Sequence, residues 1–150
     1  MWIFYLLLIL AALLQTTFIP VNLVLILILA RSFIAEDRSN YFAAFGAGII
    51  LGVMSTQNIG IWATIFLVVV RIIHLIKRLP IFENARTFLP TALLILLTVK
   101  FFEMLIFSQK TDYRVVVIEA VVSMPIFWMI RIWEERFIVK PQIKLKLRRR

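Results

Sequence analysis

The sequence predicts an all-α, polytopic membrane protein with six transmembrane helices, and two observations carry this prediction. First, 63% of the 150 residues are hydrophobic and 17% are charged, with a mean hydropathy of +0.99. A water-soluble core of this size cannot hide so much apolar surface. Second, runs such as VNLVLILILA and TALLILLTV are apolar on every face, which favours spanning helices over the alternating strands of a membrane barrel. We expect one transmembrane domain at residues 1–137 and a basic cytoplasmic tail at residues 138–150.

The apolar runs divide into six expected helices, at residues 2–18, 20–35, 40–54, 60–79, 90–108 and 113–133. A break separates the first two, because one straight helix over residues 2–30 would be roughly 43 Å long and the hydrocarbon core measures ~30 Å. Pro20 and the polar run that begins at Gln15 supply this break. The second helix is short and crosses only if the side chain of Arg31 snorkels to the interface. Five spans with a kinked first helix is the alternative.

The third and fourth segments read as a tightly packed helical hairpin, since all four glycines lie between residues 46 and 60. Ala44, Gly48 and Gly52 recur every four residues and form one smooth stripe on a helix, against which a second backbone can come close. The polar sequence STQN then predicts a turn, after which Gly60 starts the next helix. We therefore expect Ala44, Gly48, Gly52 and Gly60 to be helix-packing positions. An oligomer interface is the alternative for this stripe.

The last two helices and the charges fix the topology. Pro90 opens the fifth helix, and Pro125 lies inside the sixth and should kink it. Most of the 17 basic residues lie in the second loop, the fourth loop and the C-terminal segment. By the positive-inside rule these regions and both termini are cytoplasmic, and the STQN turn faces outward.

Three charged residues of the last two helices are expected inside the membrane. Lys100 and Glu103 are three residues apart and share one helix face. Glu119, on the antiparallel sixth helix, lies at a similar depth of roughly 8 to 9 Å. An isolated charge at this depth costs several kcal/mol, so the three are expected to form an intramembrane charged cluster. Such a cluster could be a structural ion pair or a proton or substrate site. The alternative to a cluster is that the predicted helix ends are misplaced.

Enzymatic chemistry finds little support in the sequence. The chain has no cysteine and a single histidine, His74, so we expect no metal site and no cofactor. An intramembrane aspartyl enzyme needs two acids close enough to share a proton, whereas Asp37 and Asp112 lie in loops predicted on opposite faces. We therefore expect a protein that is not an enzyme.

The C-terminal segment KPQIKLKLRRR is strongly basic. A polybasic stretch after a cytoplasmic helix end binds anionic lipid headgroups, at about 1 kcal/mol for each basic residue. Membrane lipid is therefore the expected partner, and nucleic acid is not. The residues expected to contact headgroups are Lys144, Lys146, Arg148, Arg149 and Arg150.

The order of these features resembles MreD, the small membrane component of the bacterial rod-shape complex. Members of that family show a proline that opens the second helix, an aromatic and glycine-rich third helix, and a hairpin of the form G-x-x-x-D-x-x-[small]-x-x-x-x-G. The matching residues here are Pro20, Tyr41, Phe42, Phe45, Gly48, Ser55 and Gly60. The chain departs from the pattern at Gly52, where the family usually carries an acid.

The resemblance implies a fold similar to the substrate-binding subunits of energy-coupling-factor transporters. It also implies a non-enzymatic scaffold in the bacterial cytoplasmic membrane, with the C-terminus inside. Such a scaffold binds MreC and works alongside the MreB cytoskeleton, the RodA glycosyltransferase and its transpeptidase in peptidoglycan synthesis. The alternative function is a subunit of a membrane transporter that binds a small molecule such as a vitamin.

Overall fold

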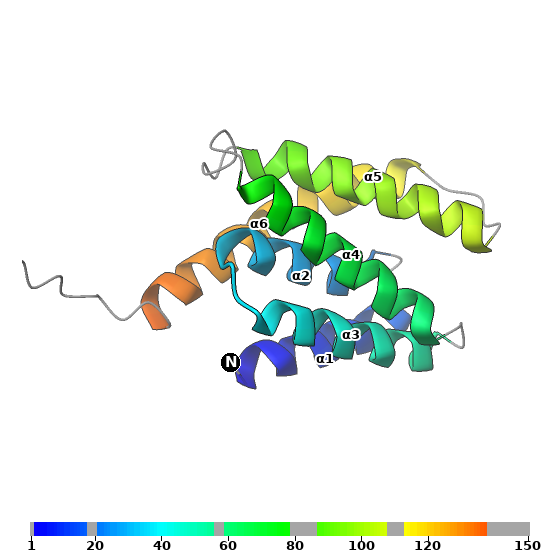
Figure 1. Cartoon of the computed structure of the whole chain (residues 1–150), viewed down its shortest axis with the longest axis horizontal. Helices are drawn as coiled ribbons and strands as arrows, with labels where there is room; N and C mark the ends of the chain where they lie inside the picture. Colours follow the sequence, from blue (N-terminus) through cyan, green and yellow to red (C-terminus); the bar gives the residue numbers. More distant parts are fainter. Residues whose placement is uncertain (1, 18–20, 56–58, 79–86, 108–112, 138–150) are drawn as a thin grey trace, which may run out of the picture.

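The computed structural model describes residues 2–17, 21–55, 59–78, 87–107 and 113–137, and the regular elements in these ranges are all α-helices (Figure 1). They are α1 (Trp2–Thr17), α2 (Leu23–Ile34), α3 (Ser39–Met54), α4 (Ile59–Lys77), α5 (Phe88–Phe107) and α6 (Tyr113–Phe137). The all-α prediction is therefore confirmed, as is the division of the N-terminal apolar run into two helices. Pro20, the middle of the STQN turn and the basic tail lie outside the described residues.

Three of the helices are long and apolar enough to cross a membrane, over Gly60–Lys77, Phe88–Ile106 and Arg114–Arg136. The other three are apolar but shorter. Large hydrophobic side chains cover much of the outer surface; Leu6, Leu94 and Val121 are 65%, 61% and 64% exposed. This composition is compatible with a helical membrane protein, because lipid can cover such a surface and water cannot. The number of spans remains a prediction.

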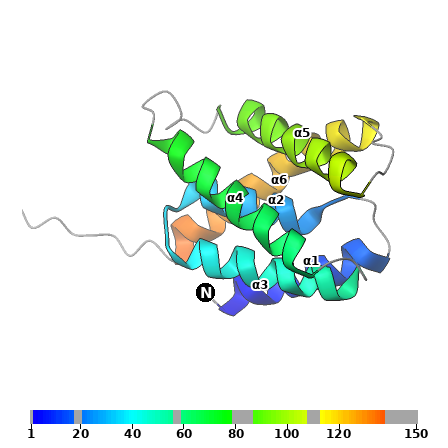
Figure 2. The same cartoon turned by 45° about the vertical axis from the view of Figure 1, so that its right-hand side comes forward.

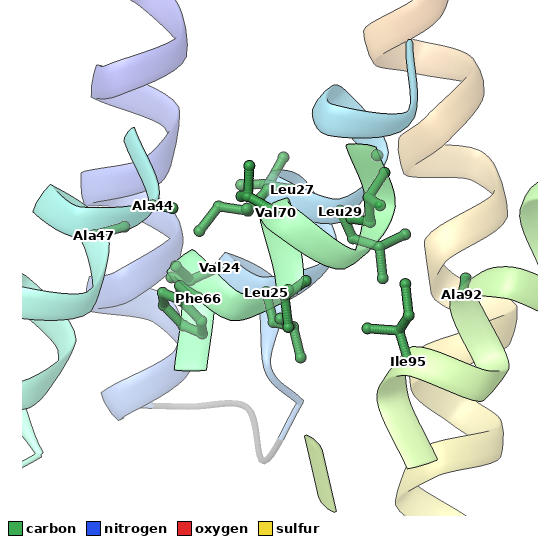
Figure 3. Packing of buried hydrophobic residues seen from close by; sticks show 14 of the residues in the cluster. Val24, Leu25, Leu27, Leu29, Ala44, Ala47, Phe66, Val70, Ala92 and Ile95 are labelled. Atoms are coloured by element: carbon green, nitrogen blue, oxygen red, sulfur yellow. The ribbon is translucent and has the colours of Figure 1, made fainter. Parts of the chain in front are cut away.

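Helix α2 lies at the centre of the fold and contacts α1, α3, α4 and α6. Every residue from Val24 to Phe33 is buried. In both overall views α4 crosses in front of α2, with α5 on one side and α1 and α3 on the other (Figure 1 and Figure 2). Figure 3 shows the apolar core around α2, with side chains from α3, α4 and α5 beside it. This position explains why the sequence of α2 is apolar on every face.

Helix α2 has 12 residues and is about 18 Å long, well short of the hydrocarbon thickness. Non-helical backbone at membrane depth is tolerated only where protein supplies its hydrogen bonds. Here Gln15 Oε1 accepts from the Val24 N–H at 3.2 Å, and Asn22 Oδ1 accepts from the Leu25 N–H at 3.1 Å. The polar residues of the predicted break thus cap the start of α2.

Helices α3 and α4 form the most extensive helix contact. A Cβ atom built on Gly48 would lie 2.3 Å from Ala63 Cα and 2.5 Å from Ala63 N. The two backbones therefore meet at Gly48, and only glycine fits there. Ala44 and Gly52 are also buried. Gly60 differs from these positions: it is exposed near the start of α4, and a Cβ there would meet no atom within 4 Å, so it takes no part in the contact between α3 and α4.

Helix α6 continues to Phe137, four residues past its expected end at residue 133. Pro125 lies inside it, as the sequence predicts, and is exposed. This extra turn contains an acidic residue, Glu134, which the prediction had placed after the end of the helix. Glu134 is buried.

Candidate functional site

The most deeply buried carboxylate of the described residues is Glu119, on α6, whose side chain is 0% exposed. Its Oε1 atom accepts a hydrogen bond of 2.9 Å from the backbone N–H of Asn22. Asn22 is the N-cap of α2, and the N-terminus of a helix carries unsatisfied N–H groups and a partial positive charge. Glu119 therefore acts as an anionic cap on the central helix, supplied from a different part of the chain.

Lys100 of α5 connects Glu119 to a second carboxylate. Its Nζ atom donates to Glu103 Oε2 at 2.8 Å and lies 3.8 Å from Glu119 Oε1. The structure thus brings together the three residues that the sequence places at one depth. Lys100 and Glu103 are mostly buried, with side chains 19% and 16% exposed.

The charges in this cluster do not balance, since one ammonium faces two carboxylates. The second oxygen of each carboxylate, Glu119 Oε2 and Glu103 Oε1, is also buried and has no hydrogen-bond partner among the described residues. An orphaned acceptor of this kind costs about 1 to 3 kcal/mol, and more when it is charged. The cluster is therefore incompletely satisfied by the protein itself.

A second buried charge pair lies at the other end of α2. Arg31 Nε is 3.3 Å from Glu134 Oε1, and both side chains are buried. The guanidinium also stacks over the ring of Phe4, with its Cζ atom 4.2 Å from the ring centroid, and donates to Ser39 Oγ at 3.2 Å. The side chain of Arg31 is thus buried inside the protein, where the end of α6 supplies its counterion.

The two charge contacts show that α2 and α6 run parallel. The start of α2 meets Glu119 and its end meets Glu134, in the same order along α6. The sequence reasoning missed this second contact because it ended the sixth helix at residue 133. The sequence does contain one signal for this contact. Arg31 and Glu134 carry opposite charges, and the helix ends at which they lie are both predicted on the cytoplasmic side of the membrane.

A cavity of about 650 Å³ lies between α4 and α5. Its walls include Gly60, Thr64 and Val68 of α4 and Leu94, Thr98 and Phe102 of α5. We call this cavity the α4–α5 groove. Both threonine hydroxyls donate to a carbonyl of their own helix, four residues earlier. The groove therefore offers an apolar surface with little free hydrogen-bonding capacity.

His74, the single histidine of the chain, belongs to no predicted site. His74 is partly buried, and its Nδ1 atom lies 3.1 Å from the hydroxyl of Tyr41. Within the described ranges no three His, Cys, Asp or Glu side chains gather in a way that could hold a metal ion. The five basic residues expected at lipid headgroups all lie in the tail, outside those ranges.

Comparisons of the chain with protein-family models, with curated proteins and with solved structures find no match. The likeness to MreD and to the transporter subunits therefore stays a prediction, based on the residues quoted above.

Proposed function

We propose that this protein is a non-enzymatic scaffold of the bacterial cell-elongation complex, which binds an MreC-type partner in the cytoplasmic membrane. Through that partner it supports the MreB, RodA and transpeptidase machinery. The sequence resemblance to MreD suggests the complex, and the apolar helices support a membrane location. The single observation that carries the scaffold role is the α4–α5 groove, which is apolar and open to the surface, so that one face of another membrane helix can pack against it.

A transmembrane helix of the partner is the occupant that suits this groove. The lining residues run from Gly60 to Ile72 on α4 and from Leu94 to Ile106 on α5, which is about 18 Å along each helix and more than half of the hydrocarbon core. Gly60 and Thr64 are small, are four residues apart and are exposed, as in the contact faces of membrane helices. Because no atom lies within 4 Å of a Cβ built on Gly60, a second helix can approach closely there.

Co-purification in mild detergent tests this proposal. The tagged protein is co-expressed with an MreC-type partner, and the amount of partner recovered is measured. Val68→Trp fills the groove and should reduce recovery at least tenfold. Val121→Trp is the matched control, because Val121 is exposed on α6 and does not line the groove. The scaffold assignment is abandoned if the wild-type protein retains no partner and its depletion leaves cell shape unchanged.

The alternative, a transporter subunit that binds a vitamin, is motivated by the cluster of Lys100, Glu103 and Glu119. A pocket for such a ligand should combine a roomy cavity with several convergent polar groups. The α4–α5 groove is roomy but apolar, which favours the scaffold. A small molecule that copurifies, or a vitamin that raises the unfolding temperature, would reverse this preference.

A further inference from the structure

The two carboxylate oxygens of Glu119 have different surroundings. Oε1 accepts the Asn22 N–H and lies near Lys100 Nζ. Oε2 is buried and has no hydrogen-bond partner in the described part of the chain. One oxygen is therefore held in place by the fold, while the other is free to bind a ligand.

The charges around Glu119 indicate what kind of ligand this is. From α5 it faces Lys100 and Glu103. From α2 it faces the helix N-terminus, which contributes about half a positive charge, while the charged residue of that helix, Arg31, is bound to Glu134. On α6 itself, Arg114 is exposed. Among Lys100, Glu103 and Glu119, two carboxylates face one ammonium, so the ligand that balances the charge of this cluster is a cation.

We propose that Glu119 Oε2 is an exchangeable proton-binding site. A hydronium ion transfers its proton to Oε2, which yields a neutral carboxylic acid and a water molecule, while Oε1 keeps the hydrogen bond from Asn22. Lys100 and Glu103 then remain as a balanced ion pair. The side chains of these two residues are 19% and 16% exposed.

A proton fits this site better than a metal ion. Sodium, calcium and magnesium need several oxygen ligands, whereas the cluster offers two free carboxylate oxygens and already holds the ammonium of Lys100. A proton needs one oxygen and no coordination shell. It also removes the excess charge, which in a membrane interior costs several kcal/mol.

Infrared spectroscopy of the full chain in nanodiscs of zwitterionic lipid tests the proposal. Lowering the pH protonates all eight acidic residues, so the wild-type spectrum is compared with that of Glu119→Gln. Their difference should contain the carbonyl band of one protonated carboxylic acid, and this band should titrate with a one-proton slope. Glu119→Gln should remove this band, and its unfolding temperature should no longer respond to pH in the range where the wild-type band titrates. Glutamine retains an oxygen that can accept the Asn22 N–H. The matched control, Glu103→Gln, should keep the band and move its midpoint.

Three results would overturn the proposal. The first is a wild-type protein with no titrating carboxylic band. The second is a band that survives in Glu119→Gln. The third is a midpoint that moves when sodium replaces potassium at constant ionic strength, because that shift means that a metal ion competes for the site. If Glu119→Gln does not fold, Glu103→Gln decides the question, because a band of Glu119 must move its midpoint when the neighbouring carboxylate is neutralised.

Discussion

The close approach of α3 and α4 at Gly48 gives the sharpest test of the packing. In Gly48→Ala the new methyl carbon would lie 2.3 Å from Ala63 Cα, 2.5 Å from Ala63 N and 2.8 Å from the carbonyl carbon of Trp62. Ordinary van der Waals contact begins at 3.4 Å. The helices must therefore separate by about 1 Å, because all three atoms belong to the backbone and cannot rotate away.

The cost of this separation can be estimated. Overpacking a well-packed core by one carbon costs typically 1 to 3 kcal/mol, and the backbone contact places Gly48→Ala at about 3 kcal/mol. For a chain of this length each kcal/mol shifts the midpoint of thermal unfolding by roughly 2 to 4 °C. We expect the unfolding temperature to fall by about 6 to 12 °C.

Gly46→Ala is the matched control on the same helix, since a Cβ at Gly46 meets no atom within 4 Å. This change should stabilise the protein by up to about 1 kcal/mol, because alanine favours the helix over glycine. Unfolding in mild detergent can be followed by tryptophan fluorescence, which suits a chain with four tryptophans and no cysteine. Trp62 is buried at the α3–α4 contact and is a local reporter.

Two results would refute this reasoning. If Gly48→Ala is as stable as Gly46→Ala, the backbones do not meet at Gly48. If the double variant Gly48→Ala/Ala63→Gly recovers the lost stability, the clash involves the Ala63 side chain rather than its backbone. We expect no recovery, because the nearest atoms are Cα and N.

Two further predictions concern charged residues. Glu134→Gln should destabilise the protein by about 3 to 5 kcal/mol, because it leaves the buried Arg31 without its charged partner. The double variant Arg31→Leu/Glu134→Leu should recover most of this loss in thermal unfolding. A double variant that is no more stable than Glu134→Gln would contradict the pairing. Hydrogen bonds from the side chain and backbone of Ser39 lower the pKa of Asp37 below its ordinary value of 3.8. Ionised Asp37 therefore stabilises the folded state at pH values above 3.8, and this stabilisation is lost as the pH falls through the lower pKa of the folded protein. Asp37→Asn should flatten the acid limb of a plot of unfolding temperature against pH, and an unchanged limb would count against this role.

The sequence predicts the structure correctly where regular helix geometry combines with a large energetic cost, such as that of a buried charge. The break near Gln15 follows from helix length, and the structure has two helices there. The spacing of Lys100 and Glu103, with Glu119 at a similar depth, predicts a cluster because an isolated charge in a membrane is costly. The structure places these three side chains together. Local rules were sufficient in both cases.

The rest depends on which helix lies beside which, and a single sequence does not contain that information. The glycine-rich hairpin is the most distinctive pattern in the sequence, yet the helix at the centre of the fold is α2. Gly60 resembles the other small residues of the hairpin but lies where no helix among the described residues covers it. The pairing of Arg31 with Glu134 needs α2 and α6 to lie side by side, and no local pattern predicts that neighbour.

The hydrogen bond from Asn22 to Glu119 has a consequence for biogenesis. Its partners are separated by 97 residues, so α2 leaves the ribosome about 5 to 20 s before its cap is synthesised. Until α6 inserts, the start of α2 is held only by groups of α1 and α2 themselves, such as Gln15 and the side chain of Asn22. The start of α2 therefore gains this hydrogen bond only late in translation, and a nascent chain that stops before residue 119 lacks it.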